Sequence, residues 1–206
     1  MLRRMQPKPK SARLSGRLRL IAIYLLVATL IVLSRPTPFS VTLGLAFVAV
    51  GEGIRIWAAG HLQKTLELVT SGPYRYTRNP LYLGRLLIFV GLCVMARMPY
   101  LANLAVLALG CLVFFAYYLP RKERVEPARL REIHGPAYER YFEAVPALFP
   151  TTIPFPETAT TGWSSERLLR NREHWMVAGL LAVWLLLLWI AYAKPEGLLG
   201  SLLSGW

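Results

Sequence analysis

Long apolar segments constrain the fold of this chain more than any other feature of the sequence. A helix that crosses the hydrocarbon core of a bilayer needs about 20 mostly apolar residues, and five segments approach that length. We therefore predict an all-α fold, a polytopic transmembrane protein with about five spanning helices. The segments are residues 17–34, 39–59, 81–96, 100–119 and 175–193.

The links between these segments suggest how the helices are arranged. Residues 35–38 and 97–99 are short and contain proline, so we expect two tight antiparallel hairpins, one from the first two helices and one from the next two. Four prolines in residues 145–156 predict an extended strap rather than a helix. The predicted parts are a basic tail at 1–16, a membrane core at 17–156, and a linker with an additional transmembrane helix at 157–206.

Basic residues are distributed unevenly along the chain. It has 24 Lys and Arg against 11 Asp and Glu, a net charge of +13, and yet 55% of its residues are hydrophobic. The cations gather in the tail, between the second and third apolar segments, and after the fourth, which places these parts in the cytoplasm. We expect a cytoplasmic N-terminus, an outside C-terminus and a bacterial inner membrane. Nucleic acid is not an expected partner.

Metal binding is not expected from the cysteines. Cys93 and Cys111 lie in apolar segments, without a CxxC partner or histidines at metal-ligand spacing. We interpret both as reduced core residues and predict no metal site.

The stretch that begins at Gly72 is the most informative. It reads Gly-Pro-Tyr-Arg-Tyr-Thr-Arg-Asn-Pro-Leu-Tyr-Leu-Gly. Its first two residues predict a turn, while Asn79 is a favoured N-cap and Pro80 fits the first position of a helix. The helix that follows would direct its free N–H groups and positive dipole end to the cytoplasm, beside Arg75 and Arg78. Such a helix start suits an anion.

A second polar cluster follows the fourth apolar segment. A helical stripe of apolar residues runs through it and is broken at Gly135 and Pro136. If the third and fourth helices form a hairpin, both polar clusters meet at one cytoplasmic end. The polar and aromatic members of this cluster are Arg121, Lys122, Glu123, Arg124, Glu126, Tyr138 and Tyr141.

Together the two clusters resemble the isoprenylcysteine carboxyl methyltransferase and phospholipid methyltransferase superfamily of membrane enzymes. The resemblance covers about residues 55–150. Asn79 and Pro127 stand where the carboxyl methyltransferases usually have His and a second Glu, which is more similar to the phospholipid N-methyltransferase branch. The matching residues are Gly72, Pro73, Tyr74, Arg78, Asn79, Pro80, Tyr82, Gly84, Glu126, Leu130, Gly135, Tyr138 and Tyr141.

The resemblance implies that cytoplasmic segments bind S-adenosylmethionine as the methyl donor. The turn at Gly72 and the helix start at Asn79 and Pro80 belong to the implied cofactor site. There the helix start and Arg78 suit the cofactor's carboxylate, and Glu126 suits its cationic groups. The aromatic residues implied to face the sulfonium or the adenine are Tyr74, Tyr82, Tyr138 or Tyr141.

The implied acceptor is a lipid-like or prenylated small molecule at the membrane. A carboxylate acceptor would be held by a cation such as Arg121. An amine acceptor would have to lose a proton, to Glu126 or Glu123. The residues leave open which of the two it is.

Glu52 and Arg55 lie three residues apart on one face of the second apolar segment. An ionised group at mid-bilayer costs roughly 2.5–3.5 kcal/mol, so such residues pair with one another or line a cavity. Both interpretations stay open, a structural pair or part of a substrate cavity. The last apolar helix carries no motif, and packing or formation of a homo-oligomer is its expected role.

Two other functions remain as alternatives. One is an NADPH-dependent isoprenoid or steroid reductase, whose similar motif typically has Trp in the place of Tyr74 and an acidic residue in the place of Arg85. The other is a membrane scaffold or transporter without enzymatic activity. Cofactor binding and the transfer of a labelled methyl group distinguish both alternatives from a methyltransferase.

Overall fold

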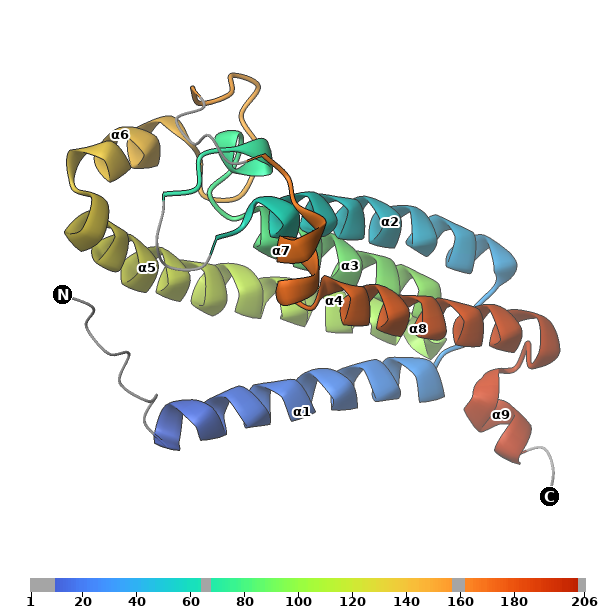
Figure 1. Cartoon of the computed structure of the whole chain (residues 1–206). Helices are drawn as coiled ribbons and strands as arrows, with labels where there is room; N and C mark the ends of the chain where they lie inside the picture. The colour runs from blue at the N-terminus through green and yellow to red at the C-terminus, as the bar shows by residue number, and fades with distance from the viewer. Residues whose placement is uncertain (1–9, 64–67, 157–161, 204–206) are drawn as a thin grey trace.

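The computed structural model describes residues 10–63, 68–156 and 162–203, and within these ranges all regular structure is helical (Figure 1). Three of the described helices are long and apolar enough to cross a membrane: α2 (Pro38–His61), the run Pro99–His134, and α8 (Glu173–Ala193). Shorter apolar helices are α3 (Pro80–Ala96) and the Ile21–Val32 part of α1 (Lys10–Val32). The prediction of an all-α membrane protein is confirmed. The other elements are α4 (Ala102–Val113), α5 (Leu119–His134), α6 (Pro136–Ala144), α7 (Ser165–Arg170), α9 (Gly197–Leu203), the 3₁₀ turns η1 (Gly72–Arg75) and η2 (Pro99–Leu101), and the π turn η3 (Phe114–Tyr118).

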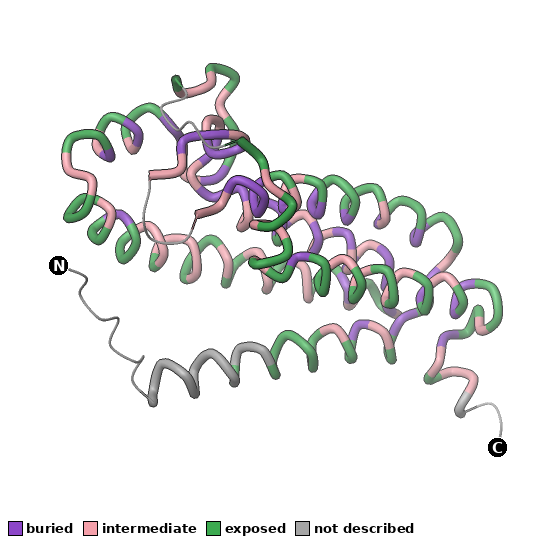
Figure 2. The backbone as a smooth tube through the Cα atoms, viewed as in Figure 1, coloured by how far each residue is buried: buried purple, intermediate pink, exposed green. Residues whose placement is uncertain are grey.

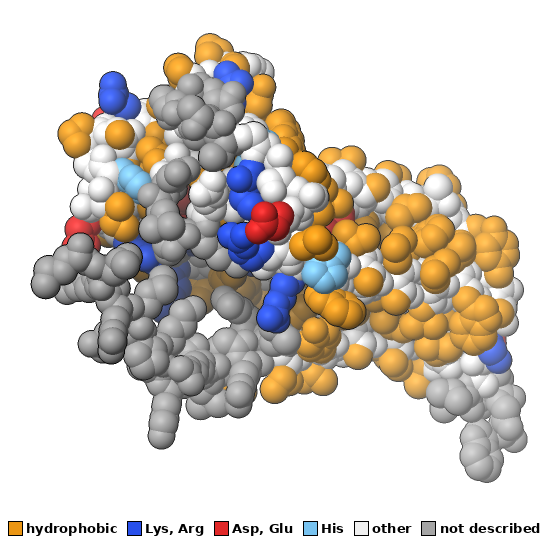
Figure 3. All heavy atoms as spheres, viewed as in Figure 1, with side chains coloured by type: hydrophobic (Ala, Val, Ile, Leu, Met, Phe, Trp, Pro, Cys, Tyr) orange, Lys and Arg blue, Asp and Glu red, His pale blue; other side chains and the backbone are white. Residues whose placement is uncertain are grey.

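The bundle has two dissimilar ends. At one end α5 and α6 extend beyond the bundle, and α9 lies at the other (Figure 1). We call the end that carries α5, α6 and α7 the charged end. On the face shown in Figure 3, most charged side chains lie towards this end, and apolar side chains cover the bundle. This division along the molecule is typical of a protein whose bundle is embedded in lipid.

The close pairing of α2 and α3 forms the centre of the bundle. A Cβ atom at Gly44 would lie 2.5 Å from the carbonyl oxygen of Gly91, and one at Gly51 would lie 2.7 Å from that of Gly84. Gly51 lies seven residues after Gly44 on α2, whereas its partner Gly84 lies seven residues before Gly91 on α3. The two helices are therefore antiparallel. Their backbones touch at two levels because small residues stand at both crossings.

The α1 helix lies apart from most of the bundle in Figure 1 and makes larger contacts with α3 and α9 than with α2. The expected tight hairpin of the first two helices is therefore wrong. The reason lies in the link after α1, where the N–H of Arg35 donates to the carbonyl oxygens of Ala96 and Arg97 at 3.1 and 3.3 Å. These bonds direct α1 to the end of α3. The expected pairing of α3 with α4 is confirmed.

The segment that contains α7 caps the C-terminal turn of α2. The Nε of Arg167 donates to the carbonyl oxygen of Gly60 at 2.7 Å, and the amide of Asn171 donates to that of Ala59 at 2.9 Å. The last carbonyl groups of a helix lack partners inside it and attract positive charge. The C-terminal part of the chain therefore caps α2 and then packs along it as α8.

A single uninterrupted helix links the membrane bundle to the charged end. It consists of α4, η3 and α5, and in η3 the N–H of Leu119 donates to the carbonyl of Phe114, five residues earlier. Pro120 follows the π turn directly. Because proline has no N–H to donate, it would interrupt an ordinary α-helix at this place. The helix ends before Gly135, whose φ is +52°, and α6 begins at Pro136. The predicted break is confirmed.

Residues 145–156 form the predicted strap. It runs without helical structure beside the loop before α3, because the N–H of Thr151 donates to the carbonyl of Tyr76 and that of Phe155 to the carbonyl of Arg75, at 2.9 and 3.0 Å. Figure 2 shows that this loop contains several of the buried residues at the charged end. Loop and strap together form the base of the candidate site.

Candidate active site

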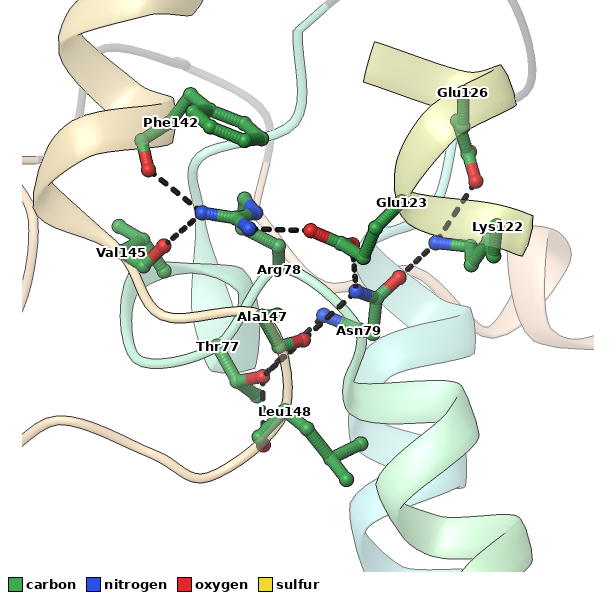
Figure 4. Close-up of polar contacts among 10 residues, drawn as sticks. All are labelled: Thr77, Arg78, Asn79, Lys122, Glu123, Glu126, Phe142, Val145, Ala147 and Leu148. Carbon is green, nitrogen blue, oxygen red and sulfur yellow. Dashed lines mark hydrogen bonds and ion pairs between the residues drawn. The ribbon is translucent and has the colours of Figure 1, made fainter. Parts of the chain in front are cut away.

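Arg78, in the loop before α3, is the centre of a hydrogen-bonded network at the charged end (Figure 4). Its Nη1 donates to the carbonyl oxygens of Phe142 and Val145, both at 2.6 Å, and its Nη2 donates to the carboxylate of Glu123. Its guanidinium carbon lies 3.9 Å from the centroid of the Phe142 ring. The backbone N–H of Arg78 donates to the carbonyl of Pro146 at 2.9 Å. One residue therefore joins the loop, α5, α6 and the strap.

Asn79 connects this network to Lys122, which in turn pairs with Glu126 one turn further along α5. Its amide nitrogen donates to Glu123 Oε1 and to the carbonyl of Ala147, both at 2.7 Å, and its carbonyl oxygen accepts from the ammonium of Lys122. The ammonium of Lys122 also lies 2.8 Å from Glu126 Oε2. Asn79 stands at the N-cap position of α3 but makes no side-chain capping bond. The predicted N-cap position is confirmed, but the capping bond is not made, because α5 and the strap engage this carboxamide.

Glu123 and Glu126 differ in their exposure and in their partners. The side chain of Glu123 is 21% exposed and bonds Arg78 and Asn79, whereas that of Glu126 is 50% exposed and pairs with Lys122. The acid that meets Arg78 is thus Glu123, three residues before the one that the resemblance implied. Glu126 lies at the rim of the network and has a carboxylate that water or a ligand can reach.

Three of the implied aromatic residues are buried beneath this network. Tyr74, Tyr138 and Tyr141 are 8%, 2% and 3% exposed, and the hydroxyl of Tyr141 donates to the carbonyl of Tyr74 at 2.8 Å. Burial raises the pKa of Tyr138 to about 12, and it raises the pKa of Tyr74 and Tyr141 further. These side chains are neutral and form an apolar wall under the polar network.

Tyr82, on the first turn of α3, already faces positive charge. The ammonium of Lys122 lies 4.7 Å from its ring centroid and the guanidinium carbon of Arg85 lies 5.4 Å from it. The ring of Tyr118 packs against it at 5.3 Å between centroids. An aromatic face in this arrangement attracts cations.

A second, deeper ionic cluster lies between α2 and α8. The Nη2 of Arg55 donates to both carboxylate oxygens of Glu173, at 2.8 and 2.6 Å. Glu52 Oε2 lies 3.4 Å from Arg55 Nε. All three residues are buried, with exposures of 8% for Glu52, 2% for Arg55 and 6% for Glu173. The pair that the sequence suggested is therefore a cluster of three, and its strongest contact is with the last long helix.

Comparison with known proteins connects this geometry with a family. Residues 39–137 match the family model described as phospholipid methyltransferase. This family is part of the superfamily of membrane methyltransferases that the sequence motifs resemble. We call residues 39–137 the phospholipid methyltransferase region. No solved structure matches the chain.

Two curated relatives are named for metal resistance. The cobalt-zinc-cadmium resistance protein CzcN of Cupriavidus metallidurans is 38% identical over 116 residues, 55% of this chain and 50% of the relative. The nickel-cobalt-cadmium resistance protein NccN of Alcaligenes xylosoxydans xylosoxydans is 35% identical over 121 residues, 58% of this chain and 54% of the relative. The chain spans about half the length of these curated relatives. Among the residues that the structure describes, no group of three or more His, Cys, Asp or Glu side chains is placed to hold a metal ion.

Other residues of the predicted site take structural positions in or near the phospholipid methyltransferase region. Gly72 has a φ of +57°, and a Cβ there would lie 2.4 Å from the ring of His61, so only glycine fits this turn. Pro80 is buried at the start of α3. Arg121 is exposed and donates to the hydroxyl of Tyr117 at 3.2 Å, one turn earlier on the same helix. Arg121 therefore lies outside the network around Arg78.

The structure brings Glu173 to these clusters, which the predicted site omitted, and it gives Lys122 and Glu123 contacts that the sequence did not predict. Lys122 and Glu123 stand in the charged stretch that the sequence singled out, but the motif assigned the role to Glu126. Glu173 lies two residues before the expected start of the last apolar helix. A lone acid at the edge of an apolar helix, opposite a buried arginine, is the signal that would have found it.

Proposed function

We propose that the chain is an integral membrane methyltransferase that transfers a methyl group from S-adenosylmethionine to a lipid-like acceptor at the cytoplasmic face. The observation that carries the proposal is the network around Arg78. It joins the two polar motifs of a phospholipid methyltransferase region at one end of an apolar bundle. The proposal takes the charged end as cytoplasmic, with the N-terminus inside, the C-terminus outside and a bacterial inner membrane as the location.

The chemical groups at the charged end fit S-adenosylmethionine. Within the described residues, the Nε of Arg78 is buried and has no hydrogen-bond partner, so a donor is available to a carboxylate. Glu126 is accessible to an ammonium group. The Tyr82 ring attracts the ammonium of Lys122, and a sulfonium that displaced this ammonium would meet the same attraction. When bound, the cofactor supplies an activated methyl group.

Cavity volume does not identify this site. A cavity of about 200 Å³ lies at the opposite end of the bundle, lined by residues that include Leu33, Arg35, Met98 and Glu196. We assign the site by its polar groups because the strap and α5 already cover Arg78. Ligand binding would therefore require the strap or α5 to move aside, as lids do in many enzymes.

The residues of the network orient the reactants and move a proton. Arg78 holds the strap and α5 in register, which fixes the space in which donor and acceptor meet. An amine acceptor has to lose a proton, and the half-exposed carboxylate of Glu126 is the accessible base. We therefore propose a phospholipid amine as the acceptor, with an isoprenylcysteine-type carboxylate as the alternative. Asn79 and Pro127 favour the amine, since both are similar to the phospholipid N-methyltransferase branch.

The experiment uses the full chain in lipid nanodiscs with S-adenosylmethionine labelled on its methyl group. One preparation contains phosphatidylethanolamine and a second contains phosphatidylcholine with a prenylcysteine analogue. We expect label in the extracted amine lipid, with a mass gain of one methylene unit for each methyl transferred. Label in the prenylcysteine analogue alone would identify the carboxylate acceptor. Oxidation of NADPH without methyl transfer would favour the reductase instead.

Binding provides the second test. We expect wild type to bind S-adenosylmethionine in calorimetry, and Glu126→Gln and Arg78→Ala to lose binding while the protein still inserts in the membrane. Arg170→Gln is the matched control, because Arg170 is an exposed partner of Glu166 and is not part of the network. If both variants bind as wild type does, the site as described is wrong. The metal tolerance of cells that lack the gene is a phenotype to examine, since two relatives are named for it.

A further inference from the structure

The ionic contact between Arg55 and Glu173 joins the phospholipid methyltransferase region to a helix outside it. Arg55 belongs to α2 within residues 39–137, and Glu173 is the first residue of α8. Both carboxylate oxygens of Glu173 accept from the same nitrogen, Nη2, at 2.8 and 2.6 Å, and both side chains are at least nine-tenths buried. Such a pair is strong when its geometry is fixed and its members are shielded from water. The start of α8 is thereby held against α2.

The same arginine also reaches the start of α3. Its Nη1 donates to the carbonyl oxygen of Leu81 at 3.3 Å, two residues after Asn79. To reach it, the side chain crosses Gly84, where a Cβ would lie 2.5 Å from Arg55 Cγ and 3.2 Å from Cδ. Because Gly84, the last glycine of the stretch that begins at Gly72, has no side chain, the side chain of Arg55 can lie across α3 at this position. One guanidinium thus contacts both the helix start that carries the motif and the acid of α8.

The hydroxyl of Tyr74 is influenced by charges of both the ionic cluster and the network at the charged end. Burial raises its pKa, and the negative charges of Glu126 and Glu173 raise it further, whereas the positive charge of Arg55 lowers it. The hydroxyl of Tyr74 therefore senses one acid from each cluster.

We infer that Glu173 is a positioning residue of the methyl-transfer site, which through Arg55 fixes the first turn of α3 and with it Asn79 and Tyr82. The inference rests on the proposed function. It gives α8 a role in the site that no motif indicated, because the first residue of this helix completes the contacts of the arginine behind the motif glycine. Glu173 itself touches neither Asn79 nor Tyr82, and it acts through Arg55.

Glu52 provides an internal comparison for Glu173. Both acids lie beside Arg55 and both are buried, but the carboxylate oxygens of Glu52 have no hydrogen-bond partner among the described residues. Removal of the charge at Glu52 leaves the tie between α2 and α8 intact. Removal of the charge at Glu173 weakens that tie, because a glutamine offers one neutral acceptor in place of a carboxylate, while Glu52 remains beside Arg55. The two substitutions therefore separate positioning from charge balance.

The experiment compares Glu173→Gln, Glu52→Gln and Glu173→Asp in the full chain in nanodiscs. We measure the Kd for S-adenosylmethionine by calorimetry, together with kcat and KM, on protein that elutes as a single species. Glu166→Gln is the control, since it removes an exposed acid from the same C-terminal segment. We expect Glu173→Gln to raise the Kd about tenfold and at least several times more than Glu52→Gln does, and Glu173→Asp to recover part of the loss.

The outcomes separate this inference from the proposed function. If wild type does not bind the cofactor, the proposed function fails and the inference fails with it. If wild type binds and Glu173→Gln binds equally well, only the inference is overturned. If Glu173→Gln does not fold, Glu173→Asp decides, because it keeps the charge and shortens the side chain. A raised Kd in that variant supports positioning, and kinetics equal to those of wild type overturn it.

Discussion

Arg78 and Glu123 are 45 residues apart in the sequence and form an ion pair at the charged end of the molecule. Arg78 belongs to the loop before α3, and Glu123 to the first turns of α5. Glu123 also accepts from Asn79, so one carboxylate holds two consecutive motif residues. The pair fixes how α5 faces the loop, and the following predictions test what depends on it.

Glu123 and Glu126, both on α5, should differ when each is replaced. Glu123→Gln removes the charge that compensates Arg78 in a mostly buried position, and we expect a loss of about 2 kcal/mol of folding free energy. Glu126→Gln affects a half-exposed pair and should change stability by less than about 1 kcal/mol. Thermal unfolding in detergent measures both. Equal losses in the two variants would show that Glu123 is not the inner partner.

Arg78→Lys should show that the shape of the guanidinium matters as well as its charge. A lysine cannot serve the carbonyls of Phe142 and Val145 and the carboxylate of Glu123 in one plane, so we expect a loss of about 2 kcal/mol and faster hydrogen exchange in the strap. Arg131→Lys is the control, because Arg131 forms a half-exposed pair with Glu139. A strap with unchanged exchange in Arg78→Lys would contradict this prediction.

The close contact of α2 with α3 should not tolerate a methyl group. In Gly51→Ala the new Cβ would meet the carbonyl oxygen of Gly84 at 2.7 Å, and we expect a loss of about 2 kcal/mol as the helices separate. Gly53→Ala, on the same helix, meets no atom within 4 Å. Since alanine is the better helix former by about 1 kcal/mol, that control should keep or gain stability. Thermal unfolding of the two variants side by side gives the comparison, and equal behaviour would rule out the close packing.

The buried tyrosines predict a loss of stability in alkaline solution. Their pKa values are raised in the folded state, to about 12 for Tyr138, above the value near 10 that the unfolded chain has. The stability from the neutral hydroxyls is therefore complete below about pH 10 and is lost as pH rises through the folded values. Unfolding measured from about pH 8 to pH 12 should show this decline.

Tyr141→Phe tests the same group of residues at neutral pH. The variant lacks the hydroxyl that donates to the carbonyl of Tyr74, and we expect a loss of about 1 kcal/mol. It also lacks one of the groups that titrate, so its alkaline decline should be smaller than that of wild type. A variant with the same alkaline profile as wild type would show that Tyr141 does not contribute to it.

Much of the architecture was predictable because it depends on local composition. The apolar segments became helices, Gly135 and Pro136 interrupt the helical stripe, and the four prolines of the strap keep it extended. Each of these features follows from the hydrophobicity of a segment or from the backbone limits of one or two residues. The sequence motifs also indicated the family that residues 39–137 match.

The partners of individual side chains were not predictable, because they depend on helix phase and on distant segments. The sequence assigned Asn79 to a cap, but its carboxamide oxygen accepts from Lys122 instead of the helix N–H groups, and its nitrogen donates to Glu123 and the strap. It placed Glu52 and Arg55 together, but the acid that binds Arg55 most closely is Glu173, 118 residues away. The α1–α2 hairpin was wrong for a similar reason, since backbone bonds to the end of α3 set the direction of the link.

The π turn at Phe114–Tyr118 has a consequence for how α5 is oriented. A turn of this kind contains about one residue more than an α-turn, which rotates all later side chains by roughly 100° about the helix axis. Deletion of a single residue between these positions would allow an ordinary α-helix to form. The acids and the lysine of α5 would then be carried around the cylinder, away from Asn79, although every one of them would still be present. The geometry of the network around Arg78 and Asn79 therefore depends on one surplus residue in an otherwise apolar helix.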